Sequence, residues 1–167
     1  MILLVIDMQK GIVDEDLYAY DTFLDRTVRL VDAARKNNVE VIFVQHDAGK
    51  GSGLSVGDEA FEIIDRIRPE QGEKVFVKTI NSCFGNKDFK AYMKSQKDKR
   101  LMIVGLQTNY CIDATVKSAF ERGYDVIIPE HMHYIMLAAT GSVDIPERLP
   151  YQVLHCPIIL RLLKSNC

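Results

Sequence analysis

The stretch LMIVGLQTNYCIDAT, residues 101–115, contains the pattern that decides the fold of this chain. Leu101–Val104 is a short apolar run of the kind that forms a buried strand. The loop Gly105–Tyr110 follows it, and Cys111 stands at or near the start of a helix-period stretch, Cys111–Arg122. A strand that leads through a short loop into a helix is half of the strand–helix–strand unit from which parallel sheets are built.

The same alternation of short strands and longer helical stretches runs through the first 130 residues. Short β-branched runs predict four further strands, at Ile2–Ile6, Val41–Val44, Val75–Val77 and Asp125–Ile128. Apolar residues at helical spacing predict three further helices, at Asp21–Lys36, Asp58–Ile67 and Asn86–Lys97. Because helix-length connections between strands form right-handed crossovers, this pattern predicts an α/β fold. We expect a three-layer α-β-α, Rossmann-like domain, with helices on both faces of a central parallel sheet of order 3-2-1-4-5. A sixth strand is left open.

Length and composition limit the classes of protein to consider. A chain of 167 residues is expected to form one domain, residues 1–167, and can bury a core without a disulfide or metal. Lys and Arg total 21 against 23 Asp and Glu, which argues against a nucleic-acid partner. Four cysteines are too few for a disulfide scaffold, and we find no signal peptide or membrane span in the sequence. We therefore expect a cytoplasmic protein with no membrane partner.

Reactive side chains follow three of the five predicted strands. Asp7 comes directly after the first strand, Lys78 after the third, and Cys111 after the loop that ends the fourth. The carboxyl ends of parallel strands lie at one edge of a sheet, where ligands bind in folds of this class. The topology therefore predicts that a carboxylate, an amine and a thiol meet at this edge.

These three groups have a coherent chemistry. A nearby ammonium and a helix N-terminus both favour the nucleophilic thiolate form of a cysteine such as Cys111. Asp7 can take the thiol proton and return it to a leaving group, while Lys78 holds Asp7 ionised and stabilises negative charge. The backbone N–H groups of residues 105–111 could form an oxyanion hole. Each residue also has a simpler interpretation, with Asp7 as a cap, Lys78 as a solvated side chain and Cys111 as core.

Four sequence motifs resemble those of a known family. The chain is similar to the isochorismatase-like cysteine hydrolases, which include nicotinamidases and N-carbamoyl amide hydrolases. The similarity covers residues 1 to about 130, in register and in order, and the motifs together are far more specific than any one of them. They are LVIDMQ at 4–9, FVQHD at 43–47, VKTINSCF at 77–84 and VGLQTNYCIDAT at 104–115.

The resemblance implies roles for particular residues. Cys111 would be the nucleophile, Asp7 the general base and acid, and Lys78 the third member of the triad. The family's cis peptide would here join Leu106 and Gln107, and would turn the amides of Gln107 and Cys111 toward one point as the oxyanion hole. The residues implied to line the substrate pocket are Gln9, His46, Asn81, Ser82, Phe84 and Tyr110.

Departures from the family pattern affect the metal and the pocket. Metal-dependent nicotinamidases carry an Asp-x-His pair and a second His after the second strand, whereas residues 45–53 read QHDAGKGSG, with one His and no partner before Lys78. The sequence therefore predicts neither a metal site nor another cofactor. His46 could instead be structural, and Phe84 could belong to the core. Gln107 stands where the family commonly has a small residue, which would narrow or polarise the pocket.

The last 37 residues differ from the rest of the chain. Residues 131–167 hold only five charged side chains and do not resemble the family's last helix and strand. A divergent subfamily, a truncated architecture and a reading-frame change near codon 130 are three explanations. We expect a last strand at Tyr151–His155 and a short helix at Ile158–Lys164. Zinc binding is an alternative for four side chains of this segment: His131, His133, His155 and Cys156.

The function that we expect is hydrolysis of a small amide or related acyl compound through a thioester on Cys111. The presence of this cysteine disfavours the cysteine-free branch that cleaves the vinyl ether of isochorismate. The alternatives are a non-catalytic binding or scaffold protein on the same fold, impaired by its tail, and a redox thiol protein without a Cys-x-x-Cys partner. The expected partner is a small-molecule substrate whose identity stays open. Family members are often homo-oligomers, and the apolar segment Pro157–Leu163 would suit burial against a neighbour.

Overall fold

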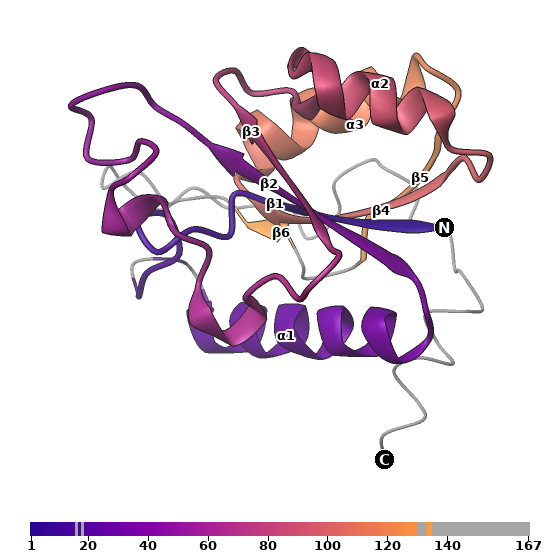
Figure 1. Cartoon of the computed structure of the whole chain (residues 1–167). Coiled ribbons are helices and arrows are strands. Elements are labelled where there is room, and N and C mark those ends of the chain that lie inside the picture. Colours follow the sequence, from indigo (N-terminus) through magenta and orange to yellow (C-terminus); the bar gives the residue numbers. More distant parts are fainter. Residues whose placement is uncertain (16, 18, 130–132, 135–167) are drawn as a thin grey trace.

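The computed structural model describes residues 1–129, except 16 and 18, together with 133 and 134. Its centre is a parallel sheet with the strand order β3-β2-β1-β4-β5, which confirms the predicted order (Figure 1). A two-residue strand, β6 (His133–Tyr134), pairs with the end of β4. The five main strands are β1 (Ile2–Ile6), β2 (Glu40–His46), β3 (Lys74–Lys78), β4 (Arg100–Leu106) and β5 (Asp125–Ile127).

Helices cover both faces of the sheet, as the sequence predicts. Figure 1 shows α1 on one face and α2 and α3 together on the other. These helices are α1 (Tyr20–Lys36), α2 (Lys87–Ser95) and α3 (Asp113–Phe120). Alternate side chains of β1 point to the two layers, because Leu3 packs in the core beneath α1 and Leu4 in the core beneath α2 and α3. Since both faces of the central strand are covered, Ile2–Ile6 is apolar throughout.

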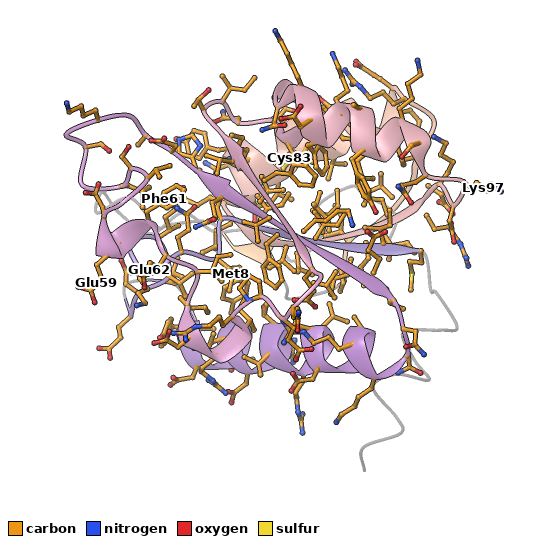
Figure 2. The ribbon with its side chains drawn as sticks, in the orientation of Figure 1. Met8, Glu59, Phe61, Glu62, Cys83 and Lys97 are labelled. Carbon is orange, nitrogen blue, oxygen red and sulfur yellow. The ribbon has the colours of Figure 1, made fainter. Side chains whose placement is uncertain are left out.

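Two sulfur-bearing side chains to which the sequence assigns no role lie in the two core layers. Figure 2 labels Met8 and Cys83, which lie on opposite faces of the sheet. Met8 belongs to the cluster that packs against α1, and Cys83 to the cluster that packs against α2 and α3. Both side chains are buried, so each of them is a core residue.

Three of the four predicted helices form, with small shifts at their ends. In α1 the buried residues Phe23, Leu30 and Ala34 follow the helical spacing that the sequence shows. Asn86 lies just before α2 and caps it, since its Oδ1 accepts from the N–H of Phe89 at 2.8 Å. The last helix begins at Asp113 because a wider π-helical turn, Thr108–Ile112, precedes it. Cys111 therefore lies in that turn and not in the first turn of an α-helix.

The predicted helix at Asp58–Ile67 is wrong. The segment forms two single 3₁₀ turns, Glu59–Phe61 and Asp65–Ile67, joined by an extended stretch. This stretch pairs with the chain that follows β1, through an antiparallel bridge between Gln9 and Ile63 and backbone hydrogen bonds on either side of it. Its inward-facing residues alternate, and the long-range hydrogen bonds satisfy backbone groups that a helix would have used internally.

Gly105 allows β1 and β4 to approach closely beside the loop that carries Cys111. Its φ angle is 123°, and a Cβ atom at this position would lie 2.0 Å from the carbonyl oxygen of Ile6, its register partner on β1. No side chain fits there without moving the backbone. The glycine therefore keeps the ends of β1 and β4 in register where Asp7 and the Cys111 loop emerge.

The described residues contain no helix that is both long enough and apolar enough to cross a membrane. The predicted elements Tyr151–His155 and Ile158–Lys164 lie outside the described residues, as do the side chains proposed for the alternative zinc site.

We predict that Gly105→Ala destabilises the fold by about 3 kcal/mol or more, because it adds both a steric clash and a strained φ angle. Urea unfolding followed by circular dichroism would measure the loss. Gly123→Ala is the matched control, since Gly123 has a φ of 75° but no heavy atom of the described chain within 4 Å of the added Cβ. This variant should lose only about 1–2 kcal/mol. Equal losses of stability in the two variants would contradict the conclusion that Gly105 is needed for the close approach of β1 and β4.

Candidate active site

The structure brings Asp7, Lys78 and Cys111 together at the carboxyl edge of the sheet. The Nζ atom of Lys78 lies 2.8 Å from Oδ2 of Asp7 and 3.1 Å from Sγ of Cys111. All three residues are buried, with exposed fractions of 2%, 1% and 8% respectively. Lys78 is therefore not a solvated side chain, and Asp7 caps no backbone N–H of the described residues, since Oδ2 bonds to Lys78 and Oδ1 has no partner. Cys111 does belong to the core cluster beneath α2 and α3, as its simpler interpretation has it.

Asp7 is positioned by a sharp change in the backbone at the end of β1. Its φ angle is 55°, in the left-handed region that few residues other than glycine adopt. The N–H of Asp7 still donates to the carbonyl of Val44 on β2 at 2.8 Å, so the residue stays attached to the sheet. Non-glycine residues held in this conformation are concentrated at functional sites.

Lys78 reaches the site because it is the last residue of β3. In the register of the sheet it stands beside His46, the last residue of β2. The backbone continues this pairing past the strand, since the N–H of Asp47 donates to the carbonyl of Lys78 at 2.8 Å. The Lys78 side chain is almost fully enclosed, and its Nζ reaches Asp7 after β1 and Cys111 after β4.

Cys111 is presented by a compact loop after β4. The peptide bond between Leu106 and Gln107 is cis. The carbonyl of Gln107 accepts from the N–H groups of Tyr110 and Ile112, at 3.1 and 3.2 Å, which closes the loop into the π-helical turn. This turn places the Cys111 thiol beside Lys78, with Sγ also 3.8 Å from Oδ1 of Asn81.

Burial and charge determine the ionisation of the three groups. Burial, followed by the charge of Asp7, raises the pKa of the Cys111 thiol to about 11, against the opposing influence of Lys78. Burial also raises the pKa of the Asp7 carboxyl, although Lys78 opposes it. Burial alone would lower the pKa of Lys78, but the charges of Asp7 and Cys111 outweigh it and raise that pKa. Burial and the charge of Asp7 therefore favour the thiol form of Cys111 over the thiolate that the sequence suggests.

His46 is a fourth side chain in contact with this group. Its Nδ1 atom lies 3.2 Å from Nζ of Lys78. Asp7, His46 and Cys111 offer a carboxylate oxygen, a ring nitrogen and a sulfur within 4.8 Å of one another, which is a donor set that suits zinc. The Lys78 ammonium lies within 3.2 Å of one atom of each of these residues, and its positive charge would repel a metal cation held by them.

A pocket of about 220 Å³ opens onto the thiol. Among the residues predicted for the pocket, His46, Asn81 and Tyr110 line it, as do Gln107 and Cys111, whose backbone amides are the predicted oxyanion hole. Two apolar residues that the sequence does not predict for the pocket, Ile12 and Leu106, also line it. Ile12 follows a turn after β1, and no local signal in the sequence marks it as part of a cavity.

The other three residues predicted for the pocket have different contacts. Gln9 is buried, and its amide joins the backbone of His46 to the carbonyl of Phe61. The hydroxyl of Ser82 donates to Oγ of Ser118 and accepts from the N–H of Phe84. Phe84 packs in the core beside α2, which is the alternative that the sequence leaves open. None of the three is among the described residues that line the pocket.

Comparisons with known sequences and structures all point to one family. The isochorismatase domain model matches residues 1–132. The chain is 30% identical over 164 residues to the uncharacterized isochorismatase-family protein YddQ of Bacillus subtilis, a match that covers 84% of this chain and 91% of that protein. It is 24% identical to the ureidoacrylate amidohydrolase RutB of Yersinia enterocolitica, over 77% of this chain and 72% of that protein. Among solved structures, an isochorismatase from Pseudomonas putida superposes with a TM-score of 0.74 at 26% identity, covering 79% of this chain and 69% of that one.

We predict that Asp7→Asn speeds the alkylation of Cys111 by iodoacetamide at pH 8 by roughly threefold or more. The substitution removes a negative charge that raises the pKa of the thiol, and it leaves the thiolate as the anionic partner of Lys78. Peptide mapping by mass spectrometry would follow the rate at Cys111. Asp113→Asn is the control, because Asp113 pairs with Lys117 on the outer side of α3 and should leave the rate unchanged. Slower alkylation in Asp7→Asn would show that this electrostatic account has the wrong sign.

Proposed function

Because the chain belongs to the isochorismatase family of hydrolases, we propose that it hydrolyses a small amide or related acyl compound through a thioester on Cys111. The single observation that carries the proposal is the contact of one buried ammonium, Lys78, with both Asp7 and Cys111 beside an open pocket. An Asp-Lys-Cys triad of this geometry suits a thiol nucleophile with an adjacent carboxylate as base.

In the first step Asp7 takes the proton of Cys111 as the sulfur attacks the substrate carbonyl carbon. Oδ2 of Asp7 is bonded to Lys78, whereas Oδ1 is buried and has no hydrogen-bond partner among the described residues, so it is the oxygen left to receive the proton. A base is required because the pKa of the thiol is about 11. Lys78 stabilises the negative charge that moves from carboxylate to sulfur and then to the carbonyl oxygen.

The tetrahedral intermediate then collapses to a thioester. The C–N bond breaks, and Asp7 gives the proton that it holds to the departing amine. Burial raises the pKa of the Asp7 carboxyl, which suits a group that must hold a proton between the two halves of the step. The backbone amides of Gln107 and Cys111 are our candidates for holding the oxyanion, since both residues line the pocket.

Water completes the reaction. Asp7 deprotonates a water molecule as its oxygen attacks the thioester carbonyl, the C–S bond breaks, and the proton passes back to the sulfur. The products are a carboxylic acid and the regenerated thiol. The same carboxylate therefore serves as base, acid and base again, which requires that it stay close to the sulfur throughout.

The size and lining of the pocket support a small substrate. A volume of about 220 Å³ accommodates a compound of a few linked groups and not an extended chain. Asn81 and Gln107 supply side-chain amides that pair with amide or ureido groups, and Ile12 and Leu106 supply apolar walls. RutB, which resembles this chain over most of its length, is a ureidoacrylate amidohydrolase by name, and this supports an amide or related compound as the substrate of the chain.

We predict that a panel of small amides, quenched with acid during turnover, gives an acyl adduct on the peptide that contains Cys111. Cys111→Ala should abolish both the adduct and the turnover, by roughly a thousandfold or more, because no other group replaces the nucleophile. Mass spectrometry of the quenched protein and ammonia release would measure the two effects.

Cys83→Ala is the matched control for the loss of a thiol. Cys83 is fully buried beneath α2 and α3, burial raises the pKa of its thiol to about 12, and it is not among the described residues that line the pocket. Its variant should keep turnover within about threefold of the unmodified chain. Unchanged turnover in Cys111→Ala, together with resistance of Cys111 to alkylation at neutral pH, would show that the proposed thioester on Cys111 is wrong.

A further inference from the structure

We propose that His46 is a positioning residue that holds the Lys78 ammonium between Asp7 and Cys111 by accepting its third hydrogen bond. The inference rests on the proposed function, since it adds a fourth residue to the proposed triad. The sequence suggests either a pocket residue or a structural histidine at this position, and the contact with Lys78 points to a more specific task.

The ammonium group of a lysine carries three N–H donors and no acceptor. The Nζ atom of Lys78 has three acceptors within reach, at 2.8 Å from Asp7 Oδ2, 3.1 Å from Cys111 Sγ and 3.2 Å from His46 Nδ1. The three acceptors match the three donors in number, so the direction of each N–H bond is determined.

Burial makes the third acceptor consequential. The Lys78 side chain is 0% exposed, so an N–H group without a partner could not turn to bulk water. A buried donor that loses its partner drives the group to rotate or shift until it finds another. Without His46, the ammonium is expected to leave its position between carboxylate and sulfur for part of the time.

The protonation state of His46 agrees with this task. An imidazole nitrogen accepts a hydrogen bond only when it carries a lone pair, so the contact requires a neutral ring with its proton on Nε2. Burial, followed by the positive charge of Lys78, lowers the pKa of His46 below its ordinary value of 6.5. The ring is therefore neutral at physiological pH and able to accept from Lys78.

The position of His46 is fixed by contacts on its other side. The side-chain amide of Gln9 bonds to both backbone groups of His46, accepting from its N–H at 2.6 Å and donating to its carbonyl at 3.0 Å. The register of β2 and β3 places His46 directly beside Lys78. The acceptor is thus held by the backbone of the sheet and by a buried glutamine, which is the support that a positioning residue needs.

The test compares His46→Leu, which has no acceptor, with His46→Asn, whose Oδ1 atom can take the place of Nδ1. Asp47→Asn is the control, because it removes a charge from the adjacent residue and keeps an acceptor for the N–H of Gly49. Two measurements are made on each variant after circular dichroism has shown that it is folded. One is the rate of Cys111 alkylation by iodoacetamide at pH 8, and the other is kcat and KM for the best amide of the panel.

We expect His46→Leu to slow alkylation roughly fivefold, because the ammonium no longer stabilises the thiolate in a fixed position. Its kcat should fall by roughly ten- to a hundredfold while KM changes by less than about threefold, since the other residues that line the pocket are unchanged. His46→Asn should restore most of both losses, and Asp47→Asn should match the unmodified chain.

Unchanged alkylation and kcat in His46→Leu would overturn the inference. Equal losses in His46→Leu and His46→Asn would also overturn it, because they would show that the ring itself is needed, as for direct contact with the substrate. The alkylation measurement needs no substrate. If the unmodified chain turns over no amide, the proposed function fails, and the alkylation rates still decide whether His46 positions Lys78.

Discussion

One buried cation organises the site of this protein. The ammonium of Lys78 lies in the centre of a group formed by Asp7, His46 and Cys111, all within 3.2 Å of it. A buried charge is costly unless it is paired and its hydrogen bonds are satisfied. The surrounding residues must therefore stay in place together, and the site depends on the requirements of the lysine as much as on those of the Cys111 thiol.

The sheet supplies the residues of this group from the ends of adjacent strands. Asp7 follows β1, His46 ends β2 and Lys78 ends β3, while Cys111 comes from the loop after β4. Strand order places β1 between β2 and β4, so these four chain positions, distant in sequence, become neighbours at one edge. The close approach of β1 and β4 at Gly105 keeps these two strands in register at this point.

The sequence was sufficient for the parts of the fold that rest on periodicity. Continuous apolar runs predict buried parallel strands, and these form in the predicted order. The error at Asp58–Ile67 has a different origin, because its backbone pairs with the chain after β1, and no local pattern reports a partner so far away in sequence.

The site shows the same division between local and long-range information. Asp7, Lys78 and Cys111 could be found by their places after strands. The bond from His46 to Lys78, the inward rotation of Phe84 and the pocket wall at Ile12 depend on how side chains turn once the strands are side by side. The sequence also does not predict the raised pKa of the Cys111 thiol, because this follows from the depth of burial and the nearness of Asp7.

The buried amide of Gln9 has a consequence for how this protein can change. Its Nε2 donates both to the carbonyl of His46, where β2 ends, and to the carbonyl of Phe61, where the chain returns to the body of the protein. One side chain therefore bonds to the residues at both ends of the intervening segment, residues 47–60. Because Gln9 bonds to backbone carbonyls at the two ends of this segment, its hold on them requires no particular side chain within residues 47–60.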